Sequence, residues 1–149
     1  MAEQMKVDVE LKTSPEKVWD TLRNSVTVFP TAFPELYKTI DVLEGDGKSA
    51  GSVRLLTFTK GNPFSVSNEK IETVDDEKMT VTYSVIDGDL MKFYKSYKCH
   101  IYVEPKGEGS LVKWTCDFEK VIDDPNEPVM IKEFAVKTFK DIEEYNLKA

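Results

Sequence analysis

The stretch GDGKSAGSVRLLTFTKG, from Gly45 to Gly61, separates three classes of protein, because each class needs a different structure around its glycines. A phosphate-binding loop of the Walker type has a glycine, four further residues, and then Gly-Lys-Ser before a helix. Gly47-Lys48-Ser49 supplies the end of that motif, but Val42 stands where the first glycine belongs. The sequence therefore argues against a nucleotide-binding loop at this position.

The same residues also match the Gly-x-Ser-x-Gly elbow of hydrolases, as Gly47, Ser49 and Gly51. That elbow needs a helix after the serine, whereas the residues from Ser52 to Thr59 are β-branched, apolar and aromatic, which indicates a strand. His100, the one histidine of the chain, would have to complete any triad, and we expect it on the surface. The stretch is interpreted as a turn between two strands, with backbone freedom at its glycines.

Alternation of apolar and polar residues extends this β pattern on both sides of the turn. Short connections rich in turn-forming residues join the segments, so neighbouring strands are expected to be antiparallel. Seven strands are predicted, at Met5 to Lys12, Tyr37 to Leu43, Ser52 to Thr59, Phe64 to Val74, Lys78 to Ile86, Lys92 to Glu104 and Ser110 to Lys120.

Helical signals occupy the remaining segments. Ser14 as the cap and Pro15 at the first position predict a short helix that runs to about Asn24. Between Val26 and Leu36, two prolines limit any helix to a turn or two. The first helix is expected to turn Val18, Trp19 and Leu22 inward.

The longest helical pattern runs from about Asp124 to Lys148, and this helix is expected to cover the apolar face of the sheet. The residues that fall at helical spacing are Ile131, Phe134, Ala135, Thr138, Ile142 and Tyr145.

Composition excludes several function classes. The chain has 149 residues, 27 acids against 20 Lys and Arg, and a formal net charge of −7, so nucleic acid is not an expected partner. Apolar runs fall far short of the ~20 residues that span a bilayer, and MAEQMKVDVE has no apolar signal core. We expect one monomeric domain over residues 1–149, cytoplasmic, without membrane association, metal or cofactor.

The two cysteines are predicted to face each other as buried, reduced thiols. If the turn between the last two strands is Lys106 to Gly109, Pro105 lies opposite Ser110, and this register places Cys99 opposite Cys116. Directly opposed positions tend to strain a disulfide, which favours free thiols. The same register pairs Val103 with Val112, Ile101 with Trp114, and Tyr97 with Phe118.

Strand parity leaves two alternatives open for Arg54. If Leu56 and Phe58 face inward, Arg54 faces inward with them and needs an internal acid such as Glu69 or an anionic group of a ligand. In the opposite phase, Arg54 is a solvated surface charge. Whether the amides of the glycine turn meet an anionic ligand is equally open.

Five motifs follow one another along nearly the whole chain: Phe29-Pro30 in VFPTAFPE, the turn Gly45 to Gly51 before Ser-Val-Arg, Gly61-Asn-Pro-Phe64, Tyr83-Ser-Val-Ile86-x-Gly88, and Gly109-Ser-Leu-Val-Lys-Trp114. In order and spacing they resemble the plant Bet v 1-like proteins, the pathogenesis-related class ten group. LMKFYKSYK and SLVKWTCDFEK are more similar to the major latex protein branch of that family.

The resemblance implies an α+β fold of the helix-grip, START-like kind. In it a seven-stranded curved antiparallel sheet wraps around a long C-terminal helix, two short helices connect the first two strands, and an apolar cavity lies between sheet and helix. Family members are mostly cytosolic carriers or binders of hydrophobic small molecules such as flavonoids, cytokinins, brassinosteroid-like sterols and lipids, with links to defence and stress. A few are enzymes of alkaloid biosynthesis.

We therefore expect a non-catalytic carrier of a hydrophobic or amphipathic plant small molecule. No catalytic residue is predicted, because parity places no convergent set of acids and lysines inside. The alternative is a cavity enzyme of alkaloid-type metabolism, which an internal lysine or carboxylate with a shifted pKa would favour. The predicted ligand-binding residues are Leu22, Phe29, Arg54, Leu56, Phe58, Phe64, Val66, Val81, Tyr83, Tyr97, Cys99, Ile101, Trp114, Cys116, Ile131, Phe134, Ala135 and Thr138.

Overall fold

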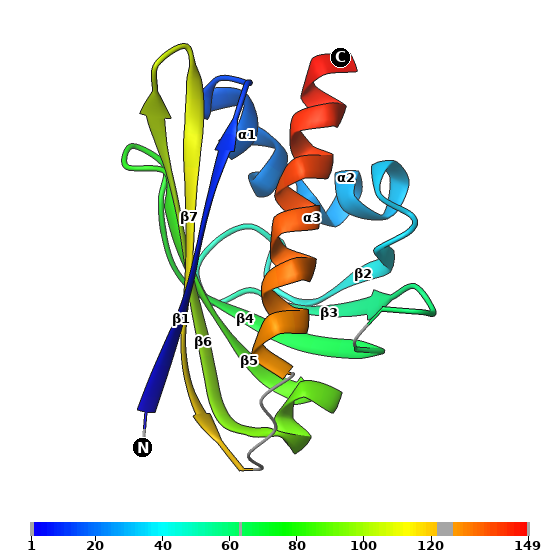
Figure 1. Ribbon diagram of the computed structural model, residues 1–149. Coiled ribbons are helices and arrows are strands. Elements are labelled where there is room, and N and C mark those ends of the chain that lie inside the picture. The colour runs from blue at the N-terminus through cyan, green and yellow to red at the C-terminus, as the bar shows by residue number, and fades with distance from the viewer. Residues whose placement is uncertain (1, 63, 122–126, 149) are drawn as a thin grey trace.

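A computed structural model describes residues 2–62, 64–121 and 127–148. Its elements are β1 (Ala2–Leu11), α1 (Pro15–Arg23), α2 (Ser25–Ala32), β2 (Tyr37–Glu44), β3 (Val53–Phe58), β4 (Val66–Asp75), β5 (Thr80–Gly88), the 3-10 helix η1 (Asp89–Lys92), β6 (Tyr94–Lys106), β7 (Gly109–Lys120) and α3 (Glu127–Lys148). The strands form one antiparallel sheet in the order β1-β7-β6-β5-β4-β3-β2. The predicted α+β fold, with its curved sheet and long C-terminal helix, is confirmed (Figure 1).

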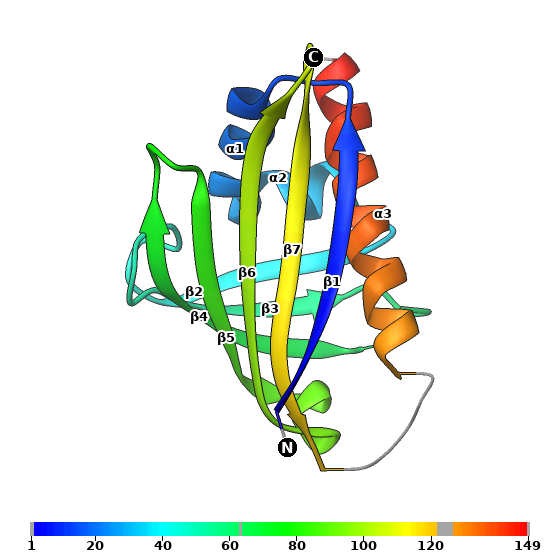
Figure 2. The same cartoon turned by 60° about the vertical axis from the view of Figure 1, so that its left-hand side comes forward.

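The sheet bends so that its two halves run in different directions. β1, β7 and β6 stand upright, β2 and β3 run across them at the base, and β4 curves from the crosswise to the upright direction (Figure 2). α3 runs over the concave side and packs against β1, while α2 packs against β2. α3 therefore covers the concave side of the sheet.

Local signals explain how the N-terminal segments fold. In β1, Met5, Val7 and Val9 are buried while the residues between them are exposed, as the alternation predicts. The hydroxyl of Ser14 accepts a hydrogen bond from the amide of Lys17 at 3.4 Å and caps α1. Both α1 and the short, proline-containing α2 are confirmed.

The hairpin of β6 and β7 has the predicted register. Cys99 lies opposite Cys116, and both are completely buried free thiols. The three other predicted pairs are also observed, namely Val103 with Val112, Ile101 with Trp114, and Tyr97 with Phe118. The register confirms that the apolar residues of this hairpin share one face of the sheet.

One segment differs from the sequence-based expectation. η1 occupies Asp89 to Lys92, where a tight turn and the start of a strand were predicted. The carboxylate of Asp89 accepts hydrogen bonds from the amides of Ser65 and Val66, at 2.7 and 3.0 Å, so the segment is anchored to the start of β4. The predicted start of the last helix at Asp124 lies outside the described residues.

In α3, the inward face is close to the predicted one. Ile131, Ala135 and Ile142 are buried as the helical spacing predicts. Tyr145 is 39% exposed, although its ring meets that of Phe33 edge-on at 6.1 Å. No helix in the described part of the chain is long and apolar enough to cross a membrane.

Candidate functional site

A pocket of about 160 Å³ lies between α3 and the concave side of the sheet. All three α-helices, η1, and every strand except β1 contribute side chains to its wall. A dry apolar cavity on the order of 150 Å³ holds one benzene-sized molecule, whereas drug-sized ligands occupy roughly 300–1,000 Å³. The pocket as it stands therefore fits a compact ligand, and a larger one requires the lining side chains to move.

Most residues of the predicted site line this pocket. They are Leu22, Phe29, Arg54, Leu56, Phe58, Phe64, Val81, Tyr83, Tyr97, Ile101, Trp114, Ile131, Phe134, Ala135 and Thr138. The pleat accounts for the members that lie in strands, since alternate residues of a strand reach the same side. In β3 this phase carries Arg54 into the pocket together with Leu56 and Phe58, so the inward alternative for Arg54 is the correct one.

Val66 was predicted to line the pocket and does not. It is 36% exposed, because the chain bends at Ser65, whose amide is held by Asp89, and the alternation starting at Phe64 does not continue into β4. β4 instead presents Ser67, Glu69 and Ile71 to the pocket. The prediction therefore had the inward and outward positions of β4 exchanged.

Cys99 and Cys116 were also predicted to line the pocket, and neither does. Both are buried on the predicted face of the sheet but lie outside the pocket lining. Each thiol is next to a longer side chain, Tyr83 beside Cys99 and Tyr97 beside Cys116. The tyrosines reach the pocket, and the short cysteine side chains stay behind them.

Arg54 and Glu69 form the buried polar centre of the pocket. They are direct cross-strand partners in β3 and β4, and Arg54 Nη2 donates to Glu69 Oε1 at 3.2 Å. Their side chains are 12% and 11% exposed. Arg54 Nη1 donates to the hydroxyl of Ser25, in α2, at 2.7 Å. The internal partner expected for an inward Arg54 is thus Glu69.

Burial and the ion pair act on Glu69 in opposite directions. Desolvation raises the pKa of the carboxyl, and the nearby Arg54 guanidinium together with a hydrogen bond from Ser67 lowers it, with a net upward shift. Glu69 is the carboxylate among the lining residues, and no lysine lines the pocket within the described chain. The pocket therefore holds one carboxylate with a raised pKa, and that carboxylate already has a partner.

Tyr37, Phe58 and Phe134 form an aromatic triangle with ring centroids 5.4–5.7 Å apart. They come from β2, β3 and α3, so the triangle joins the base of the sheet to the helix. The Tyr37 hydroxyl lies 3.1 Å from the Thr138 hydroxyl, and burial raises the pKa of Tyr37 well above its usual range. Its polar end is satisfied within the protein.

Tyr83 and Trp114 form a second polar contact in the wall. The indole Nε1 of Trp114 donates to the Tyr83 hydroxyl at 3.2 Å, and burial raises the pKa of Tyr83 well above its ordinary value. The hydroxyls of Tyr37 and Tyr83 are therefore both neutral hydrogen-bonding groups, and neither is suited to act as a base near neutral pH.

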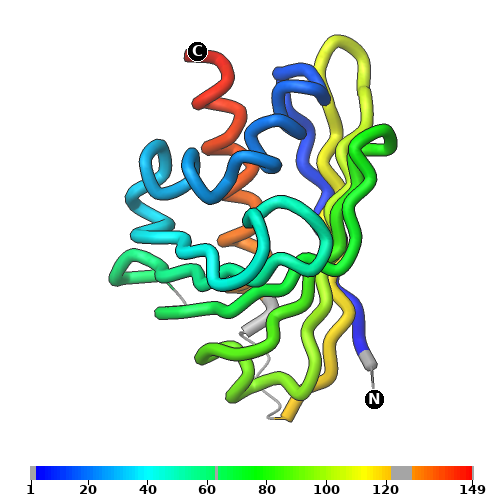
Figure 3. The backbone as a smooth tube through the Cα atoms, turned by 180° about the vertical axis from the view of Figure 1, so that it is seen from behind, coloured from blue at the N-terminus to red at the C-terminus, as the bar shows by residue number. Residues whose placement is uncertain are grey.

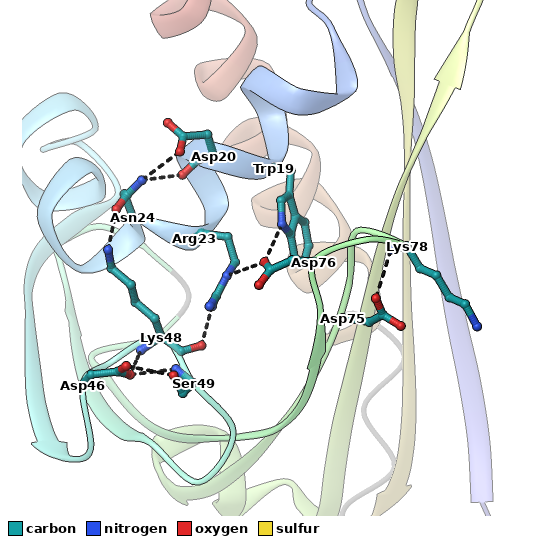
Figure 4. Close-up of polar contacts among 10 residues, drawn as sticks. All are labelled: Trp19, Asp20, Arg23, Asn24, Asp46, Lys48, Ser49, Asp75, Asp76 and Lys78. Carbon is teal, nitrogen blue, oxygen red and sulfur yellow. Dashed lines mark hydrogen bonds and ion pairs between the residues drawn. The ribbon is translucent and has the colours of Figure 1, made fainter.

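A polar network forms one wall of the pocket, where α1 meets the glycine turn and the β4–β5 turn (Figure 4). Trp19 Nε1 and Arg23 Nε both donate to Asp76 Oδ1, at 2.9 and 3.1 Å. Arg23 Nη1 also donates to the carbonyl of Lys48. Because Trp19 and Arg23 line the pocket, this network ties its wall to two turns that are distant in sequence.

The glycine turn, residues 45–51, arches beneath α1 (Figure 3) and satisfies its own amides. Asp46 Oδ1 accepts hydrogen bonds from the amides of Lys48 and Ser49, at 2.8 and 2.7 Å. Gly45 and Gly47 have φ of +77° and +83°, and a Cβ at Gly45 would lie 2.5 Å from Ser52 Oγ. These amides already have an internal anion, which argues against the phosphate cradle and against an anionic ligand at the turn.

His100 lies outside the pocket, as predicted. Its side chain is 39% exposed and contacts Thr82 Oγ1 at 2.9 Å and Asp117 Oδ2 at 3.1 Å. Within the described residues, no three His, Cys, Asp or Glu side chains are grouped as ligands for a metal ion.

Further lining residues were not in the predicted set: Trp19, Arg23, Ser25, Tyr37, Ile40, Gly47, Ser67, Glu69, Ile71, Val85, Leu90 and Phe139. Parity provided a usable signal for Val85, and helical spacing provided one for Trp19. Glu69 could be found only as the partner that a buried Arg54 requires. Leu90 belongs to η1, which no sequence pattern indicated.

Comparisons with known proteins agree with this geometry. The sequence profile of the "Pathogenesis-related protein Bet v 1 family" matches residues 1–149. MLP-like protein 423 of Arabidopsis thaliana is 48% identical over 143 residues, which cover 95% of this chain and 92% of that protein. The crystal structure of ginseng major latex-like protein 151 from Panax ginseng has a TM-score of 0.86 at 26% identity and covers 97% of both chains.

An enzyme is among the similar structures. Norcoclaurine synthase from Thalictrum flavum has a TM-score of 0.84 at 19% identity, covering 100% of this chain and 88% of that one. An identity this low indicates a shared fold alone.

Proposed function

Because the chain belongs to the pathogenesis-related protein Bet v 1 family, in its major latex protein branch, we propose that it is a non-catalytic carrier of a hydrophobic or amphipathic small molecule. The ligand binds in the pocket between α3 and the sheet. Its class is that of plant hormones, flavonoids, sterols or lipids, with a role in defence or stress.

The observation that carries the proposal is a largely apolar pocket with a single buried ion pair. Apolar surface removed from water contributes about 25 cal/mol per Å² to binding, and a few polar groups orient the ligand. Ala135 and Thr138 are small residues on the pocket face of α3, and they leave room between the helix and the sheet.

A cavity enzyme is the second candidate, and the raised pKa of Glu69 is the observation that favours it. General acid–base catalysis needs a positioned group that is free to exchange a proton with the substrate. Glu69 is instead held by Arg54, and the hydroxyls of Tyr37 and Tyr83 are neutral and hydrogen-bonded. The carrier therefore accounts better for the arrangement.

The test is binding of the dye ANS to the native protein and its displacement by ethylbenzene, a compact apolar probe. Both tryptophans of the chain, Trp19 and Trp114, line the pocket, so their fluorescence gives a second signal. We expect ANS emission to rise with native protein and to fall as ethylbenzene is added. A folded protein that binds neither probe would contradict the carrier function.

A further inference from the structure

One of the three guanidinium nitrogens of Arg54 has no hydrogen-bond partner among the residues that the structure describes. Nη1 and Nη2 donate to Ser25 and Glu69, whereas the Nε–H is shielded from solvent and has no hydrogen-bond partner among the described residues. A buried N–H without an acceptor costs the full desolvation penalty of that group. Arg54 lines the pocket, so a bound molecule can supply the acceptor.

Other polar groups of the pocket wall already have hydrogen-bond partners within the protein, so a ligand acceptor is expected at Arg54. The hydroxyls of Tyr37 and Thr138 are paired with each other, the Tyr83 hydroxyl accepts from Trp114, and Arg23 is engaged with Asp76. Among the lining side chains, the one buried nitrogen without a partner in the described structure is Arg54 Nε.

The net charge of the buried Arg54–Glu69 pair indicates the chemical class of the acceptor. Arg54 and Glu69 together carry no net charge while both are ionised, and both are nearly excluded from water. A carboxylate or sulfonate on the ligand would add an uncompensated negative charge beside Glu69, which is costly at this burial. A neutral carbonyl, ether or hydroxyl oxygen satisfies the N–H without that penalty.

We propose that Arg54 Nε is a specificity-determining donor and that the ligand is an apolar molecule with a neutral oxygen acceptor directed at it. This inference rests on the carrier function proposed above and names the class of molecule carried. The ion pair with Glu69 holds the guanidinium in place, and the apolar wall surrounds the rest of the ligand.

The test compares three compact probes of nearly equal shape: acetophenone with a neutral acceptor, ethylbenzene without one, and benzoate with an anionic one. Dissociation constants are measured by isothermal titration calorimetry at neutral pH for the wild type and for Arg54→Lys. Lysine keeps a positive charge for Glu69 but has no Nε–H. Comparing the two proteins cancels the different hydration of the probes.

In Arg54→Lys we expect acetophenone to bind roughly tenfold more weakly or worse, the loss typical of a hydrogen bond to a charged donor, and ethylbenzene to change less than about threefold. Benzoate is expected to bind wild type at least about tenfold more weakly than acetophenone. Lys38→Ala, which removes a positive charge from an exposed position of β2 outside the pocket lining, is the control and should keep the acetophenone-to-ethylbenzene ratio.

A second variant provides a test in case the Arg54→Lys protein does not fold. Arg54→Met combined with Glu69→Gln removes both charges together and leaves no unpaired ion, and it should also lose the advantage of acetophenone.

If wild type binds both neutral probes and neither variant changes their ratio, the donor role is wrong and the carrier function stands. If benzoate binds most tightly, the neutral class is wrong. If wild type binds neither neutral probe, both proposals fail.

Discussion

Asp46 supplies, from within the chain, the negative charge that a phosphate brings to a nucleotide-binding loop. Its carboxylate accepts from two backbone amides and from the hydroxyls of Ser49 and Ser52, at 2.8 and 3.2 Å. These hydrogen bonds to the ionised form hold the pKa of Asp46 far below its ordinary value of 3.8. The shape of the glycine turn therefore depends on an ionised Asp46.

Asp46→Asn is expected to destabilise the protein at neutral pH, because the variant loses the charge and one acceptor. A carboxyl whose pKa is lowered on folding contributes stability above its unfolded pKa and loses it as the pH falls through the folded pKa. The difference in unfolding free energy between wild type and variant should stay constant down to about pH 3.8 and shrink only below it. Urea unfolding at a series of pH values measures this.

Asp41→Asn is the control for this prediction. Asp41 is exposed in β2 and makes no side-chain hydrogen bond or ion pair within the described residues, so its replacement should change stability little. A difference for Asp46→Asn that grows as the pH falls would show that the carboxylate does not stabilise the turn.

Cys99 and Cys116 are expected to be unreactive in the native protein. Both thiols are completely buried, and burial raises the pKa of Cys99 well above its ordinary value, so the reactive thiolate is scarce. The reagent DTNB should release about two equivalents of chromophore in urea and almost none at pH 8 without it. Rapid reaction of one native thiol would mean that the β6–β7 hairpin opens locally.

Among the elements, α1 is linked to the glycine turn and the β4–β5 turn by Arg23. Arg23→Ala removes the contacts to Asp76 and to the Lys48 carbonyl and frees this wall of the pocket. We expect ANS to associate and dissociate severalfold faster in stopped-flow measurements. Stability should change by less than about 1 kcal/mol, because the Asp76 side chain is 69% exposed and solvent screens such a pair.

Lys17→Ala provides the matched control on the same helix. The Lys17 side chain is exposed and α1 keeps its cap at Ser14, so the kinetics should match those of the wild type. Equal acceleration by both variants would indicate a general loosening of α1 and would contradict a specific role for Arg23.

Elements with a strong local pattern were predictable from the sequence. β1 alternates without interruption, α1 has a cap and a proline at its start, and the β6–β7 hairpin has a register fixed by its turn. Each of these depends on neighbouring residues alone, so no knowledge of the fold was needed to place them or to orient their side chains.

The phase of β4 was not predictable, because it depends on a contact made across the chain. The bend at Ser65 is held by Asp89, which is 24 residues away, and it moves Val66 to the outer side of the sheet. Burial of Arg54 was likewise undecided, because either phase of β3 buries apolar side chains. The structure has the phase that pairs Arg54 with Glu69 on the adjacent strand, a contact that the local pattern of β3 does not contain.

For the molecule as a whole, we expect the empty space of the pocket to make no contribution to the stability of the fold. The buried residues of β1, β6 and β7 pack together on the upright half of the sheet, and the aromatic triangle of Tyr37, Phe58 and Phe134 connects α3 to the base. Filling the remaining space should therefore remove ligand binding without loss of the fold, which separates carrier function from stability.

Ala135→Leu places three additional carbon atoms in the pocket from the inward face of α3. At about 0.8 kcal/mol for each buried CH₂, stability can rise by up to about 2 kcal/mol, provided that the pocket of about 160 Å³ accepts the side chain without strain. We expect an unchanged or higher Tm and at least tenfold weaker ethylbenzene binding by calorimetry. Glu133→Leu adds the same side chain to the exposed face of α3 and should leave binding intact. A less stable Ala135→Leu protein that still binds ethylbenzene would mean that the ligand site lies elsewhere.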